Sequence, residues 1–117
     1  MIVDDEEEIL ANLGRVLRRA NYEVILASKG ALALELADKH LPDLILLDIV
    51  MPDMDGGDVA AKLSRNKATA NIPIIFLTGV LTKNEENAIT SSGGRYVMAK
   101  PVTPREVLEM IDKVFAA

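Results

Sequence analysis

The sequence contains no cysteine and only one histidine among its 117 residues. The lack of cysteine excludes disulfide bonds, thiolate zinc sites, iron–sulfur clusters and thiol nucleophiles. Aromatic residues are also few, two tyrosines and two phenylalanines, so the core must be built from aliphatic residues, alanine and methionine. No apolar run approaches the roughly 18 residues of a membrane span, and the acidic start is the reverse of a positively charged export leader. We therefore expect a cytoplasmic protein with no membrane partner.

Positive charge is in deficit, with 13 basic residues against 18 acidic ones and a formal net charge of -5 at pH 7. Nucleic acids and anionic membranes are bound through basic stripes, so we expect no direct binding to either. A chain of 117 residues can bury one hydrophobic core but is too short for two cores of ordinary size. We expect residues 1–117 to form a single domain.

Short apolar runs alternate along the chain with longer segments of helical periodicity. The expected strands span residues 2–3, 23–27, 44–47, 72–77 and 96–98, and the expected helices span residues 9–20, 31–39, 58–65, 82–92 and 103–115. Strands joined by crossover helices lie parallel, and right-handed crossovers place helices on both faces of the sheet. The pattern predicts an α/β fold, a doubly wound five-stranded parallel sheet with five helices, whose sites form beyond the carboxyl ends of the strands.

Polar side chains follow four of the five expected strands at that end of the sheet. Asp4 and Asp5 follow the first strand, Asp48 the third, Thr78 the fourth and Lys100 the fifth. Each residue alone has an ordinary explanation as a turn former, a helix cap or a solvated charge. Their coincidence at one end of the sheet favours a functional site.

The flavodoxin-like strand order 2-1-3-4-5 would bring these side chains together. Neighbouring strands lie roughly 4.8 Å apart, so Asp48 would have the acids of the first strand on one side and Thr78 on the other. Lys100 would lie two strands away, and its flexible stem can lean toward Asp48. Closely packed carboxylates repel one another and need a cation. Oxygen ligands without histidine or cysteine suit Mg²⁺.

Five motifs occur in order along the chain: Val3-Asp4-Asp5-Glu6, Pro42-Asp43-Leu44-Ile45-Leu46-Leu47-Asp48, Met51-Pro52-Asp53-Met54-Asp55-Gly56, Ile75-Phe76-Leu77-Thr78-Gly79 and Ala99-Lys100-Pro101. Together they resemble the receiver domain of two-component response regulators, over essentially the whole chain. The resemblance implies that Asp48 is a phosphoacceptor, which takes a phosphoryl group from the phosphohistidine of a sensor histidine kinase or a phosphotransfer protein. Such a domain is not an enzyme in the usual sense, because it catalyses only its own phosphorylation and dephosphorylation.

The resemblance also implies a set of ligands for Mg²⁺. Asp5, Asp48 and the backbone carbonyl of Val50 would bind the ion directly, and Asp4 would bind it directly or through water. The neighbouring Glu6, at the start of the following helix, is expected to be structural, since a helix N-terminus favours anions.

Further roles follow from the resemblance for the fourth and fifth strands. Lys100 would contact one phosphoryl oxygen and the Thr78 hydroxyl another, with Thr78 moving inward on phosphorylation, and the Lys100–Pro101 peptide would be cis. The family's switch aromatic usually stands three residues before the lysine, where this chain has Val97. Tyr96 is one residue earlier, so it is expected on the opposite face unless the strand is bulged. The fourth helix, fifth strand and fifth helix would form the surface that meets a downstream effector or output domain, or a second copy in a homodimer.

Two other functions fit the same expected fold. A pseudo-receiver would act as an interaction surface without phosphorylation, but the intact set of site residues argues against it. A phosphatase of the haloacid dehalogenase type also uses an aspartyl nucleophile after a strand, but it needs a second acid two residues later, where this chain has Val50. Val50 and Val80 would flank the phosphoryl group without a polar atom to orient water, and we therefore expect slow self-dephosphorylation.

Overall fold

The computed structural model describes residues 1–79 and 96–116. Their elements, in chain order, are β1 (Ile2–Val3), α1 (Glu7–Arg19), β2 (Leu26–Ala27), α2 (Gly30–His40), β3 (Ile45–Asp48), α3 (Gly56–Arg65), β4 (Ile74–Thr78), β5 (Tyr96–Ala99) and α5 (Pro104–Ala116). The five strands form one sheet in the order β2-β1-β3-β4-β5, and all neighbouring pairs are parallel. The predicted sheet and strand order are thus confirmed. Four helices lie in the described part of the chain, whereas the expected helix over residues 82–92 and Val80 lie outside it.

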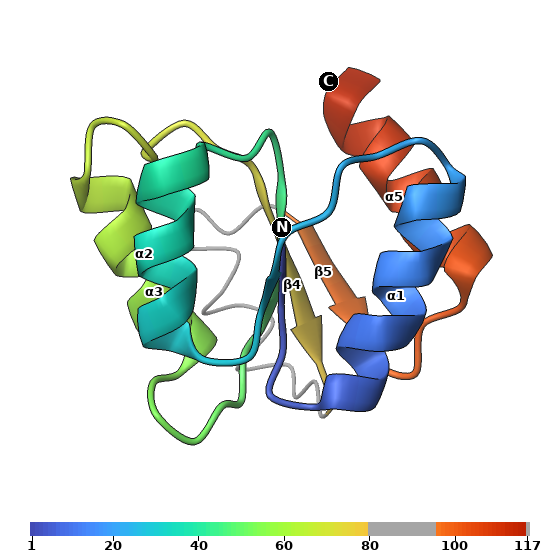
Figure 1. Ribbon diagram of the computed structural model, residues 1–117, viewed down its shortest axis with the longest axis horizontal. Helices are drawn as coiled ribbons and strands as arrows, with labels where there is room; N and C mark the ends of the chain where they lie inside the picture. The colour runs from blue at the N-terminus through green and yellow to red at the C-terminus, as the bar shows by residue number, and fades with distance from the viewer. Residues whose placement is uncertain (80–95, 117) are drawn as a thin grey trace.

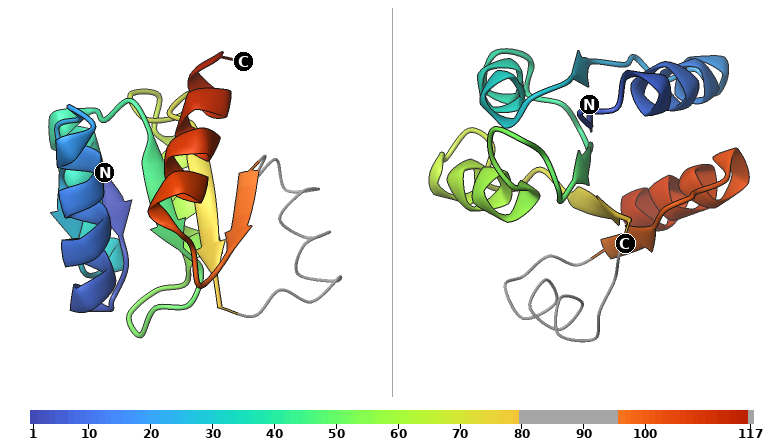
Figure 2. Two further views of the ribbon diagram at one scale, coloured as in Figure 1. Left: turned by 90° about the vertical axis from the view of Figure 1, so that its right-hand side faces the viewer. Right: turned by 90° about the horizontal axis from the view of Figure 1, so that it is seen from below.

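Helices cover both faces of the sheet (Figures 1 and 2). Helices α1 and α5 lie on one face and α2 and α3 on the other. Alternate residues of β3 supply the two cores, because successive side chains of a strand point to opposite faces. Leu46 packs in the cluster that includes α1 and α5, whereas Ile45 and Leu47 pack in the cluster that includes α2 and α3. Both clusters consist mainly of aliphatic side chains, as the shortage of aromatic residues requires. No helix of the described residues is long and apolar enough to cross a membrane.

The start of each later helix depends on an acceptor for its first amides. The side chain of Asp55 accepts the amide of Asp58 at 2.8 Å, so α3 begins at Gly56, two residues before the predicted start. In α5 the Thr103 hydroxyl accepts the amide of Glu106 at 3.2 Å and donates to its carboxylate at 2.9 Å, so Thr103 is the N-cap of this helix. The helix α2 has no such local cap, since its N-cap residue, Lys29, makes no side-chain hydrogen bond to it.

The second strand is much shorter than predicted. The apolar pattern over residues 23–27 suggested five strand residues, but β2 consists of Leu26 and Ala27 only. Its neighbour β1 has two residues, so the ladder between them has two residue pairs. Val24 and Ile25 are nevertheless packed against opposite cores, which explains why this segment has the hydrophobic pattern of a strand.

Candidate functional site

Three carboxylates meet at the carboxyl ends of β1 and β3. Asp4 directly follows β1, and Asp48 is the last residue of β3. The parallel register pairs Val3 with Leu47, which places these two acids side by side. The side chains of Asp4, Asp5 and Asp48 each offer an oxygen atom within 4.8 Å of the others. Asp4 and Asp48 are buried, with 0% and 3% of their surfaces exposed, while Asp5 is exposed.

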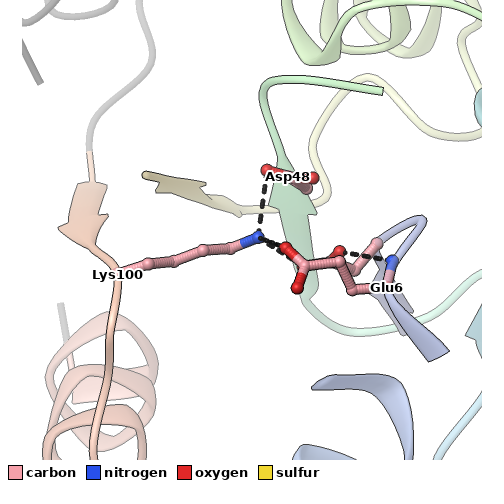
Figure 3. A network of polar contacts seen from close by, with 4 residues as sticks. Glu6, Asp48 and Lys100 are labelled. Atoms are coloured by element: carbon pink, nitrogen blue, oxygen red, sulfur yellow. Dashed lines mark hydrogen bonds and ion pairs between the residues drawn. The ribbon is translucent and has the colours of Figure 1, made fainter. Parts of the chain in front are cut away.

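The Lys100 side chain crosses from the end of β5 to this carboxylate group (Figure 3). Its Nζ atom lies 2.8 Å from Oδ2 of Asp4 and 3.3 Å from Oδ1 of Asp48. A third carboxylate, that of Glu6, lies 3.6 Å from the same nitrogen. The backbone amide of Lys100 donates to the carbonyl of Thr78 at 2.7 Å, and the Lys100–Pro101 peptide bond is cis. The Lys100 side chain thus extends from β5 past the end of β4 to Asp48 and Asp4, as predicted.

One ammonium group does not neutralise these carboxylates, and the pKa values reflect this. Burial raises the pKa of Asp48 to about 6, and the charge of Asp4 adds to the increase, while Lys100 opposes both. Burial lowers the pKa of Lys100, but the hydrogen bond and charge of Asp4, followed by those of Asp48, outweigh it and leave that pKa raised. The site therefore carries an excess of negative charge that a further cation would relieve.

The residues present fit a magnesium ion. Oδ2 of Asp4 is buried, and its one partner among the described residues is the Lys100 ammonium at 2.8 Å. The same ammonium also lies near Asp48 and Glu6, so a bound metal ion would complete the neutralisation of these acids. The acids supply only oxygen ligands, which are those that Mg²⁺ prefers, and Asp4, Asp5 and Asp48 are enough for the one or two carboxylates that usually bind this ion.

The loop after Asp48 turns back at once and is tightly packed. The amide of Ile49 donates to the carbonyl of Leu77 at 3.0 Å, and the amide of Gly56 donates to the carbonyl of Ile49 at 2.7 Å. A Cβ atom at Gly56 would lie 2.5 Å from the carbonyl oxygen of Asp48, so only glycine allows this approach. Val50, within the loop, has 71% of its surface exposed.

The fourth and fifth strands place the remaining predicted site residues. Thr78 is the last residue of β4, buried and next to the end of β3. The β4–β5 register runs without a bulge from Ile75 with Tyr96 to Thr78 with Ala99. Tyr96 packs against the core beneath α1 and α5, and Val97 packs against the other core. The bulged alternative is therefore wrong.

Two further acids, Glu6 and Asp53, make contacts in this region that the sequence pattern does not predict. Glu6 was expected to be a purely structural residue of the first helical turn, but it stands before α1 and reaches Lys100. Asp53, in the loop after Asp48, accepts the amides of Gly30 and Ala31 at 3.1 and 3.2 Å. The motif around Asp53 marks a loop, but nothing in the sequence indicates a partner 23 positions earlier.

Comparison with known proteins finds relatives that match nearly the whole chain. The family model of the response regulator receiver domain matches residues 1–112. The alkaline phosphatase synthesis transcriptional regulatory protein PhoP of Bacillus subtilis is 39% identical over 107 residues, 92% of this chain but 44% of PhoP. The polar-differentiation response regulator DivK of Brucella ovis is 33% identical over 111 residues, 95% of this chain and 90% of DivK. The chain thus spans less than half of one relative and most of the other.

Solved structures agree with the sequence relatives. The chemotaxis protein CheY4 of Vibrio cholerae superposes with a TM-score of 0.91 at 28% identity, covering 97% of this chain and 94% of CheY4. A CheY-like receiver domain protein from Methanospirillum hungatei gives a TM-score of 0.90 at 29% identity, covering 98% of this chain and 90% of that one. The carboxylates at the ends of β1 and β3, the lysine from β5 and these matches lead to one conclusion: the chain belongs to the response regulator receiver domain family.

Proposed function

We propose that this receiver domain accepts a phosphoryl group on Asp48 from the phosphohistidine of a sensor histidine kinase or phosphotransfer protein. The observation that carries the proposal is the setting of the Asp48 carboxylate, which is buried, lies 3.3 Å from the Lys100 ammonium and shares a cation site with Asp4 and Asp5. A carboxylate oxygen of Asp48 attacks phosphorus, the phosphorus–nitrogen bond breaks and the donor imidazole leaves. The product is an acyl phosphate.

Mg²⁺ would be held by Asp5, Asp48 and the backbone carbonyl of Val50, with Asp4 binding directly or through water. When bound, the ion neutralises the acids and the incoming phosphoryl oxygens, so that catalysis is mainly positioning and electrostatics. Asp4 then no longer depends on the ammonium beside it.

Lys100 and Thr78 would bind the transferred group. The Lys100 ammonium already lies between Asp4 and Asp48, so a small movement brings it to a phosphoryl oxygen on Asp48. The Thr78 hydroxyl, at the end of the neighbouring strand, would bind a second oxygen and carry the following residues with it. Gly79 leaves room beside the site, since an added Cβ there would meet no described atom within 4 Å.

The output would pass through β5 and α5, together with the segment before β5. A domain of residues 1–117 that works in the cytoplasm would meet a downstream effector, an output domain or a second copy at this surface. The aromatic rotamer found in many relatives would not take part, because Val97 stands at its position and Tyr96 faces the opposite core. Neither the pseudo-receiver nor the phosphatase has a finding that favours it over phosphorylation of Asp48.

The test is amide NMR in the presence of Mg²⁺ with beryllofluoride, which stands in for a phosphoryl group, or with acetyl phosphate as the donor. We expect shifts centred on Asp48 and Thr78 in the wild type and none of them in Asp48→Asn. The control is Asp38→Asn, at an exposed position on α2 where asparagine can still accept the hydrogen bond from Asn66. Wild-type shifts elsewhere, or the same shifts in Asp48→Asn, would contradict the proposal.

A further inference from the structure

The N-terminus of α2 is capped by a residue from a distant part of the chain. Oδ1 of Asp53 accepts the amide of Gly30 at 3.1 Å and Oδ2 accepts the amide of Ala31 at 3.2 Å. Lys29 makes no side-chain cap, and the first turn of α2 contains no acidic residue. The other described helices carry an acid in the first turn, and α3 and α5 have a local cap as well. The start of α2 therefore depends on the loop after Asp48.

Close packing accompanies these hydrogen bonds. A Cβ atom at Gly30 would lie 2.9 Å from Cβ of Met54 and 3.0 Å from a methyl carbon of Val59. The loop thus lies directly against the backbone of the first turn of α2, where only a glycine leaves enough space. Two adjacent loop residues, Asp53 and Met54, are held there, one by hydrogen bonds and one by contact.

The same loop is fixed at its other end beside the phosphoacceptor. Gly56 donates to the carbonyl of Ile49 and lies against the carbonyl of Asp48. Val50 lies between Ile49 and Asp53 in the loop. Its side chain is mostly exposed and contributes little packing of its own. The backbone of Val50 is flanked by Ile49, which is hydrogen-bonded to Leu77 and Gly56, and by buried Met51. Beyond Met51, the loop is fixed on α2 by Asp53.

We propose that Asp53 is a positioning residue for the cation site: by holding the loop on α2, it keeps the Val50 carbonyl in place as a ligand and couples the first turn of α2 to Mg²⁺ binding. The inference rests on the proposed function, in which that carbonyl binds the ion. Hydrogen bonds from the amides of Gly30 and Ala31 lower the pKa of Asp53, so this cap is a carboxylate at neutral pH. Because coupling between two sites is reciprocal, bound Mg²⁺ also stabilises the first turn of α2.

The test compares two losses of a helix cap. Asp53→Ala removes the cap of α2, and Thr103→Ala removes the cap of α5, which is not connected to the loop. We expect both variants to lose thermal stability to a similar degree. Mg²⁺ affinity, measured from amide NMR shifts during a MgCl₂ titration, should fall about tenfold in Asp53→Ala, as for other residues that orient metal ligands, and stay unchanged in Thr103→Ala. Mg²⁺ should also slow hydrogen exchange at the amides of Gly30 and Ala31 in the wild type.

A second variant separates position from charge. Asp53→Asn removes the negative charge and keeps one of the two oxygens that accept the amides of Gly30 and Ala31, so its Mg²⁺ affinity should lie between those of the wild type and Asp53→Ala. Equal losses in the two variants would assign the effect to charge and overturn the inference, as would wild-type affinity in Asp53→Ala. If the wild type itself does not bind Mg²⁺, the proposed function fails together with this inference.

Discussion

Replacing Asp48 by asparagine should make the protein more stable in the absence of divalent cations. The substitution keeps the shape of the side chain and removes one buried negative charge. Asp48 lies next to buried Asp4, and the two share the Lys100 ammonium. Asparagine at this position leaves Lys100 with Asp4 at 2.8 Å, so the ammonium does not lose its nearest partner. Repulsion inside the site is therefore reduced without a new unpaired charge.

The magnitude follows from the pKa of Asp48, which burial and Asp4 raise from 3.8 to about 6. The folded state then holds the proton more tightly than the unfolded state, so stability falls as the pH rises from 3.8 to about 6 and stays reduced above that range. A shift of about two pKa units corresponds to at most about 3 kcal/mol at pH 8, and about half of that remains at pH 5. Asp48→Asn does not titrate and escapes this loss.

Urea unfolding in the presence of a chelator, at pH 8 and at pH 5, measures the difference in the free energy of unfolding between the two proteins. We expect Asp48→Asn to be more stable than the wild type by up to about 3 kcal/mol at pH 8, with a smaller difference at pH 5. Mg²⁺ should reduce this difference in stability, because its binding stabilises the wild type by mass action. Asp112→Asn, at an exposed position on α5, is the control and should change stability by less than about 0.5 kcal/mol. Equal or lower stability of Asp48→Asn at pH 8 without cations would refute the reasoning.

Two more predictions concern single side chains. Val50→Asn should speed the loss of the phosphoryl group from Asp48 about tenfold, which corresponds to a barrier lower by about 1.4 kcal/mol, because an exposed amide there can orient water. The decay is followed by NMR after removal of the phosphoryl donor, with Val50→Leu as the apolar control. An unchanged decay rate in Val50→Asn would contradict this prediction. Leu41→Gly should raise the free energy of unfolding by about 0.5–1 kcal/mol, because Leu41 has a φ of 47° and is 51% exposed. Thermal unfolding measures this change, and the control Leu41→Ala should not raise the stability of the protein. A lower melting temperature for Leu41→Gly would argue against backbone strain at this position.

The sequence predicted the sheet and the gathering of the site well because both depend on local patterns. The run of apolar residues in β3 ends in Asp48, and the ends of parallel strands meet at one edge of the sheet. Once the strand order is known, Asp4, Asp48 and Lys100 must come together, and they do so within hydrogen-bonding distance. The resemblance to receiver domains added the expected ligand set, which the spacing of residues alone does not supply.

Other features could not be predicted because they depend on contacts between distant residues. The hydrophobic pattern of residues 23–27 reports burial against two cores, not hydrogen bonding to β1, and so it overestimated β2. The glycines after Asp55 were interpreted as loop, although Gly56 begins α3. The cap that Asp53 provides for α2 and the approach of Glu6 to Lys100 exist only in the folded chain.

The brevity of β2 limits how this protein can associate with other chains. An exposed sheet edge is a template for strand addition, whether by a recognition peptide or by an aggregating copy. Here the outermost strand on that side offers two residues, roughly 7 Å of backbone. A foreign strand would find too few hydrogen-bonding groups to dock there. At this edge of the sheet, contacts with other chains should therefore be made by side chains of helices and loops, which surface substitutions can change without exposing the sheet.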